Sequence, residues 1–333
     1  MKPNVEVRNV SKIFGKSPKT AADLLVQGKS KKEILKKTGQ TVGVNNVSFE
    51  IYPGEIFVIM GLSGSGKSTL IRMFNRLIDP TIGEILIDNE DIVKMNSARL
   101  REVRQKKISM VFQNFALFPH KTILENAEFG LEIQKVDPTK RQEKAMKALE
   151  AVGLKGYENQ LPSQLSGGMQ QRVGLARALA SDTDILLMDE AFSALDPLIR
   201  KDMQDELIEI QEQFKKTIIF ITHDLGVVAE LCDRVLVMYG GLIMEEARIE
   251  DIFERPGHPY TMGLLHSIPD VEQEKSERLE PIPGSPPDMT NPPAGCPFAP
   301  RCSYARKVCA GSLPDFVEVG EGHRTRCFLQ YED

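Results

Sequence analysis

Short apolar runs, separated by glycine loops and polar stretches, are the main pattern along this chain. The runs 56–60, 185–188 and 217–222 are unbroken and rich in strand-forming residues, as is typical of parallel strands buried on both faces. Residues 108–112 form a fourth strand-like run. Because these runs alternate with stretches long enough for helices, the pattern predicts an α/β fold around a largely parallel sheet.

Two further patterns predict a hairpin and a core helix. Residues 235–239 and 242–245 flank a glycine pair at 240–241, which predicts a β-hairpin. Apolar residues at helical spacing predict a helix packed in the core. They are Met169, Val173, Ala176 and Leu179. The polar residues 170–172 on that helix face either a bound nucleotide or solvent.

A glycine-rich loop follows the first apolar run directly. Its residues are Gly61, Leu62, Ser63, Gly64, Ser65, Gly66, Lys67, Ser68 and Thr69. The glycines let backbone N–H groups turn toward phosphate oxygens, and the helix that follows presents its positive end to the same anion. Lys67 should reach the β- and γ-phosphates of ATP, and Ser68 should ligate Mg²⁺. The alternative, a chance glycine-rich turn, fits poorly with a strand before the loop and a helical pattern after it.

Acidic residues and a histidine stand at the ends of two other predicted strands. Asp189 and Glu190 follow the run 185–188, and His223 follows 217–222. Ligands bind at this end of open α/β sheets. We expect Asp189 to hold Mg²⁺ through water, Glu190 to polarise the attacking water and His223 to bond the γ-phosphate. The alternative for the two carboxylates is a solvated strand end.

The segment Leu165-Ser166-Gly167-Gly168-Met169 resembles the signature of ATP-binding cassette (ABC) ATPases. The resemblance implies a RecA-like phosphate-loop core, an antiparallel β subdomain and a helical signature subdomain. It also implies a head-to-tail dimer, in which Ser166, Gly167 and Gly168 complete the ATP site of a second ABC subunit, identical or different. Bare N–H groups at a helix start suit such an anion site.

The same resemblance assigns roles to three more residues. Gln113 matches the glutamine that senses the γ-phosphate and Mg²⁺, Asp196 matches a loop at the dimer interface, and Phe14 matches the aromatic residue that stacks on adenine. Membrane permease subunits, and indirectly an extracytoplasmic solute-binding protein, are the implied partners.

Composition limits the other partners. The chain has 42 basic and 47 acidic residues and a net charge of -5, so no global attraction to nucleic acid or to an anionic membrane is expected. No apolar run is long enough to span a bilayer, and the N-terminal residues lack a secretory signal. We therefore expect a peripheral protein at the cytoplasmic face of the cell membrane, without a nucleic-acid partner.

The chain resembles two importer families in different parts. Residues 1–225 resemble the ATPases of glycine betaine/proline importers, whose group also has an insertion like 16–40; here it contains seven lysines and two acidic residues. That insertion is either a solvated helical hairpin or a contact to anionic lipid. Residues 226–333 resemble di- and oligopeptide importer ATPases, so the chain is a natural recombinant or a laboratory hybrid.

We expect a nucleotide-binding domain at 1–255, with the helical subdomain at about 114–170, and an extension at 256–333. Eight prolines within 281–300 predict an extended connection there.

Four cysteines lie close together in the extension, at positions 296, 302, 309 and 327. Clustered cysteines in a cytosolic chain argue against disulfides, and four thiolates suit an iron–sulfur cluster or a zinc ion. The peptide-importer resemblance implies a 4Fe–4S cluster on Cys296, Cys302, Cys309 and Cys327; zinc and unliganded thiols are the alternatives. The fifth cysteine, Cys232, is expected in the core.

The leading hypothesis is the ATPase subunit of an importer for glycine betaine or related quaternary amines, because the region around Gln113 that should choose the permease is betaine-like. Peptide import is the alternative for the solute. A soluble ABC ATPase of translation or DNA repair is the alternative class, although such proteins typically have tandem cassettes or a long coiled-coil insertion, and neither is evident here.

Overall fold

A computed structural model describes residues 2–113, 115–192, 195, 197–267, 282–287 and 292–331. The chain divides into two compact units. We call residues 1–2, 52–56 and 94–221 the helical unit, and residues 3–51, 57–93 and 222–333 the two-sheet unit. Within the described ranges, every helix is too short or too polar to cross a bilayer.

The helical unit combines a small parallel sheet with long helices. Its strands follow the spatial order β6-β7-β8 and pair in parallel. They are β6 (Ile108–Val111), β7 (Ile185–Asp189) and β8 (Thr217–Thr222). The helices are α4 (Ser97–Lys106), α5 (Ile123–Ile133), α6 (Pro138–Ala151), α7 (Gly167–Ala180) and α8 (Pro197–Phe214), with a 3₁₀ turn at Pro162–Gln164. Every residue of β7 and β8 is buried, as their unbroken apolar runs predicted.

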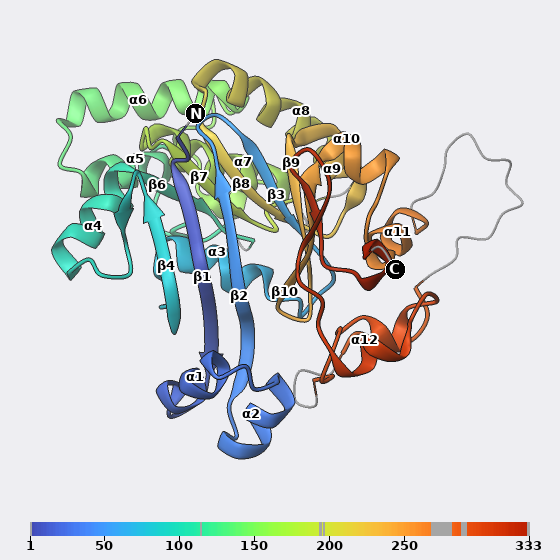
Figure 1. The fold of residues 1–333 in the computed structure, drawn as a ribbon. Helices are drawn as coiled ribbons and strands as arrows, with labels where there is room; N and C mark the ends of the chain where they lie inside the picture. The colour runs from blue at the N-terminus through green and yellow to red at the C-terminus, as the bar shows by residue number, and fades with distance from the viewer. Residues whose placement is uncertain are drawn as a thin grey trace, which may run out of the picture. The chain divides into compact units, whose positions relative to one another are not determined.

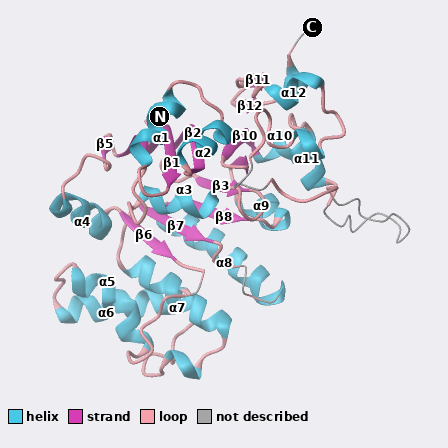
Figure 2. Cartoon of the chain, turned by 90° about the horizontal axis from the view of Figure 1, so that it is seen from below, coloured by secondary structure: helices cyan, strands magenta, loops and turns pink. Residues whose placement is uncertain are grey.

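Helices α5, α6 and α7 lie together in the helical unit (Figure 2). Thr122 and Glu125 form a capping box at the start of α5, and Asp137 caps α6 ahead of Pro138. Such caps satisfy N–H groups that the first helical turn leaves without partners. The apolar residues at helical spacing in α7 include Val173, which is fully buried, so the prediction of a core helix is confirmed.

The two-sheet unit contains an antiparallel sheet of order β2-β1-β4-β5, of which Figure 1 shows β2, β1 and β4 side by side. Its strands are β1 (Val5–Phe14), β2 (Thr41–Ile51), β4 (Ile82–Ile87) and β5 (Glu90–Asp91). The predicted antiparallel β subdomain is thereby confirmed.

A second set of strands in this unit follows the order β11-β12-β10-β9-β3. They are β3 (Ile56–Met60), β9 (Arg234–Tyr239), β10 (Leu242–Arg248), β11 (Val317–Gly320) and β12 (His323–Thr325). The helices are α3 (Lys67–Phe74), α9 (Leu225–Leu231), α10 (Ile249–Glu254), α11 (Pro259–Leu265) and α12 (Lys307–Gly311), with 3₁₀ turns at Ala299–Arg301 and Phe328–Gln330. Strand β3 is fully buried and pairs in parallel with β9. The hairpin predicted around 240–241 is the antiparallel pair β9–β10.

Residues 16–40 form two helices, α1 (Pro18–Val26) and α2 (Lys31–Thr38), which lie at one end of β1 and β2 (Figure 1). Ala21 and Ile34 pack with Ile13 and Val42 of these strands. The lysine-rich pair of helices α1 and α2 is therefore attached to the sheet by apolar contacts.

Candidate nucleotide site

The phosphate loop leaves β3 through three glycines with positive φ. Gly61, Gly64 and Gly66 have φ of 144°, 80° and 101°, a region that favours glycine. A Cβ atom on Gly61 would lie 2.2 Å from the Met238 carbonyl oxygen. Glycine at position 61 is therefore required both by the backbone angle and by the close approach of β9.

Lys67, the first residue of α3, turns back over the loop. Its ammonium is buried and donates to the carbonyl oxygens of Gly61 at 2.7 Å and Leu62 at 3.2 Å. The Ser65 hydroxyl is also buried and has no hydrogen-bond partner among the described residues, which is costly unless a ligand supplies one. A cation, a helix N-terminus and an unsatisfied hydroxyl at one loop fit a phosphate group.

The other loop residues predicted to bind ATP differ in exposure. Ser63 and Gly64 are exposed, whereas Ser68 and Thr69 are half-buried. Their roles toward ATP and Mg²⁺ stay predictions.

The predicted catalytic residues of the helical unit lie at the end of its parallel strands. Asp189 is the last residue of β7 and is buried, and Glu190 follows with φ of 49°. Gln113 follows β6 and donates from Nε2 to Glu190 Oε2 at 3.3 Å. The structure thus brings Gln113 and Glu190 together, and Asp189 offers the oxygen ligands that Mg²⁺ prefers.

The signature residues form the start of α7. Ser166 caps the helix, and its hydroxyl accepts from Met169 N–H at 3.3 Å. A Cβ atom on Gly167 would meet no atom of the described residues within 4 Å, whereas one on Gly168 would lie 2.7 Å from the Ile199 side chain. This helix start is open at Ser166 and Gly167, both of which are exposed.

For residues 170–172, the solvent alternative is wrong at Gln171, and the nucleotide alternative stays a prediction. Gln171 is buried, and Arg172 donates to the Val152 carbonyl oxygen at 2.9 Å and pairs with Glu206 at 2.7 Å. Gln170 donates to two carbonyl oxygens of the preceding turn. Gln170 and Arg172 therefore have partners in their own chain, whereas the buried Gln171 amide has no hydrogen-bond partner among the described residues.

Three predicted site residues remain: Phe14, His223 and Asp196. Phe14, at the end of β1, is 42% exposed, and the Lys12 ammonium lies 5.4 Å from its ring centre. An exposed aromatic ring is suited to stacking. His223 is exposed just after β8. Asp196 lies outside the described residues.

The Gly240-Gly241 turn contributes to the loop in a way that sequence reasoning missed. Gly241 N–H donates to the Ser65 carbonyl oxygen at 2.9 Å. Lys31 of α2 donates to the Gly240 carbonyl oxygen at 2.5 Å, and burial lowers the pKa of Lys31 to about 7. Both glycines have positive φ. The adjacent glycines are therefore the feature of the sequence that could have pointed to this tight turn.

The four clustered cysteines line one cavity of the two-sheet unit. Burial raises the pKa of Cys302 and Cys327, and it raises the pKa of Cys296 to about 11. Arg306 and Arg326 line the same cavity. No three His, Cys, Asp or Glu side chains in the described ranges are placed to hold a single metal ion. Cys232 lies apart from the cavity and is buried, as predicted, with its thiol on the Val228 carbonyl oxygen.

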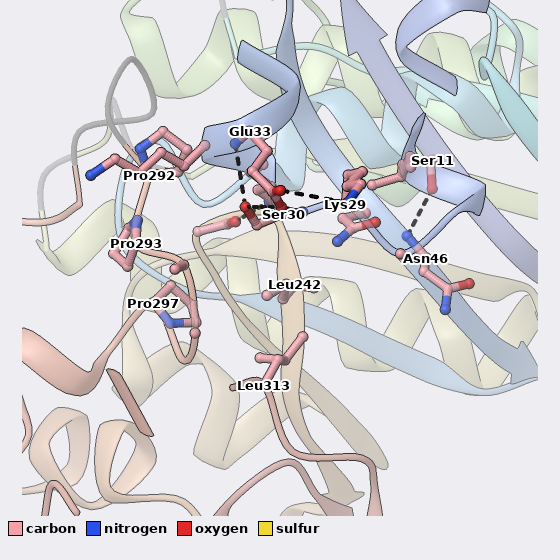
Figure 3. Close-up of a pocket in the computed structure, with 18 of the residues that line it drawn as sticks. Ser11, Lys29, Ser30, Glu33, Asn46, Leu242, Pro292, Pro293, Pro297 and Leu313 are labelled. Atoms are coloured by element: carbon pink, nitrogen blue, oxygen red, sulfur yellow. Dashed lines mark hydrogen bonds and ion pairs between the residues drawn. The ribbon is translucent and has the colours of Figure 1, made fainter. Parts of the chain in front are cut away.

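A separate cavity of about 950 Å³ lies beside α2 (Figure 3). Ser30, Lys29 and Glu33 border one side of it, and Pro297 and Leu313 of the extension border another. None of the described phosphate-loop residues lines it, so it is distinct from the phosphate loop.

The parallel strands, the phosphate loop and its helix define a phosphate-loop protein. Residues 44–193 match the family described as ABC transporter, and residues 244–309 match the oligopeptide/dipeptide transporter C-terminal region. The chain belongs to the ATP-binding proteins of ABC transporters.

Three comparisons illustrate the likeness. The glycine betaine transport ATP-binding protein OpuAA of Bacillus subtilis is 64% identical over 79% of this chain and 63% of its own length. The glycine betaine/proline betaine transport system ATP-binding protein ProV of Escherichia coli is 52% identical over 81% of this chain and 67% of its own length. The dimeric bacterial ABC transporter cassette MJ0796 matches with a TM-score of 0.63 and 32% identity over 74% of this chain and 98% of the cassette. The chain spans slightly less than two-thirds of OpuAA.

Proposed function

We propose that this chain is the ATP-hydrolysing subunit of an importer for glycine betaine or related quaternary amines. The high identity to a glycine betaine transport ATP-binding protein carries this proposal. Lys67 would hold the phosphates, Asp189 and Ser68 the Mg²⁺, and Glu190, oriented by Gln113, the attacking water. Such a subunit works as a dimer at the cytoplasmic face of a separate permease.

Co-purification from membranes tests the transported solute. Cells carrying both a betaine-type and a peptide-type permease would express the tagged chain, and its partner would be identified by mass spectrometry. We expect the betaine-type permease. Capture of the peptide-type permease would favour the second candidate, an oligopeptide importer, which the match of residues 244–309 supports.

Ser166→Arg should abolish ATP hydrolysis and leave ATP binding by the monomer intact. Because Ser166 is exposed at the start of α7, a bulky cation there would block the partner's phosphates without touching the phosphate loop of its own chain. ATPase assays and equilibrium ATP binding check this, with Ser163→Arg, another exposed position, as the control. Wild-type turnover in Ser166→Arg would argue against the shared dimer site.

We also propose that the cysteine cavity holds a 4Fe–4S cluster. In such a cluster each cysteine binds a different iron, so the four thiols that line the cavity need not converge on a single ion. Two arginines on the wall would offset the negative charge of the cluster. When bound, the cluster would crosslink the segments that carry the cysteines. Because burial raises the pKa of Cys296, Cys302 and Cys327, the cationic iron would be needed to stabilise their thiolates.

Cys302→Ser should lower the iron content of anaerobically purified protein from about four atoms per chain to below one, with loss of the visible absorption. Cys232→Ser is the matched control, because this buried thiol lies outside the cavity. Metal analysis and absorption spectra check the result. About one zinc per wild-type chain, or no metal, would contradict the cluster.

A further inference from the structure

The phosphate loop is hydrogen-bonded to a residue of the C-terminal extension. Leu62 N–H donates to the Tyr260 hydroxyl oxygen at 2.9 Å, across 198 positions of sequence. Tyr260 is fully buried in α11, and burial raises the pKa of its hydroxyl. The hydroxyl is therefore neutral at physiological pH and available as an acceptor.

A buried carboxylate, that of Glu245, fixes the start of the helix that carries Tyr260. Glu245 of β10 accepts from Gly257 N–H at 2.5 Å and His258 N–H at 3.1 Å, just ahead of α11, and from the Thr261 hydroxyl. It also pairs with His323 of β12 at 2.7 Å. These bonds attach the start of α11 to the β9–β10 hairpin.

The ring of Tyr260 is held by two other aromatic rings. Its centre lies 4.5 Å from that of Tyr239 and 5.3 Å from that of Phe298. Such tilted pairs are favourable beyond simple burial. The hydroxyl therefore has little freedom to leave Leu62.

We propose that Tyr260 is a positioning residue for the phosphate loop, holding the Leu62 amide so that the loop is shaped for the phosphates of ATP. The inference rests on the proposed function. Lys67 holds the Gly61 and Leu62 carbonyl oxygens, and Tyr260 holds the intervening N–H, so the first peptide of the loop is fixed on both sides. Without the hydroxyl, a partly buried N–H loses its partner, which favours a different loop conformation.

The test is Tyr260→Phe in the full chain, which keeps the ring and removes the hydroxyl. We expect the dissociation constants of ATP and ADP, and the KM for ATP, to rise about three- to tenfold, with kcat within about twofold. Tyr331→Phe is the matched control. It removes a tyrosine hydrogen bond in the same extension, from the Tyr331 hydroxyl to the Asp315 carbonyl oxygen at 3.3 Å.

Three outcomes count against the proposal. Unchanged nucleotide affinity in Tyr260→Phe, even with a lower melting temperature, would make Tyr260 a packing residue and leave the proposed function intact. An equal loss of affinity in Tyr331→Phe would assign the effect to general loosening of the extension. A wild-type chain that bound no ATP would overturn the proposed function and this inference together.

Discussion

Glu190→Gln should reduce ATP turnover by about 10²- to 10⁴-fold while ATP affinity stays within about twofold of wild type. Glutamine keeps the size and polarity of the side chain but cannot accept a proton, and a positioned general base contributes about this factor. The Gln113 amide would still have an oxygen to donate to at position 190. The loss should therefore fall on kcat, because ground-state binding is preserved.

Steady-state hydrolysis and ATP-dependent dimerisation, measured by light scattering, check this prediction. The variant should accumulate as an ATP-bound dimer, since hydrolysis would reopen it. Glu212→Gln, an exposed carboxylate in the same unit, controls for the loss of one negative charge. Turnover near the wild-type rate would exclude Glu190 as the base.

The parts of this fold that local sequence determines were predictable. Unbroken apolar runs mark β3, β7 and β8, because a strand buried on both faces has no polar position. The phosphate loop is equally local, since glycine spacing and the following helix are contiguous in sequence. The pairing of Gln113 with Glu190 spans 77 positions, but it could be inferred from the strands, because each residue follows one of two neighbouring parallel strands.

The parts that depend on long-range partners were not predictable. Arg172 looked as suited to a nucleotide as to solvent, and only the position of Glu206 and the Val152 carbonyl decides its role. Tyr260 has no local pattern that points to Leu62. A hydrogen bond across nearly 200 residues requires the fold itself, which residue spacing along one sequence does not contain.

The two segments that resemble different importer groups both reach the nucleotide site region. Lys31, from the betaine-type insertion, binds the Gly240 carbonyl next to the residue that holds Ser65. Tyr260, from the peptide-type extension, binds Leu62. The extension is therefore not an independent appendage, because one segment is hydrogen-bonded to the phosphate loop and the other to the glycine turn beside it.

Gly61→Ala should weaken ATP binding at least about a hundredfold. The new methyl group would lie 2.2 Å from the Met238 carbonyl oxygen, and φ of 144° is unfavourable for alanine. Because the methyl group and the Met238 carbonyl of β9 cannot occupy the same space, the loop must move away from β9. Losing two charge-assisted hydrogen bonds to phosphate, at about 1.5 kcal/mol each, accounts for that factor.

Equilibrium binding of ATP and the free energy of unfolding should both be measured for Gly61→Ala. Gly28→Ala is the matched control, because Gly28 also has positive φ, of 76°, but a methyl group there meets no atom within 4 Å. We expect the control to lose about 1 kcal/mol of stability from backbone strain and to bind ATP normally. If Gly61→Ala bound ATP as tightly as the control, the close packing of the loop on β9 would not be what shapes the phosphate site. In that case, the hydrogen bond from Leu62 N–H to Tyr260 would have to keep the loop in its conformation without the packing on β9.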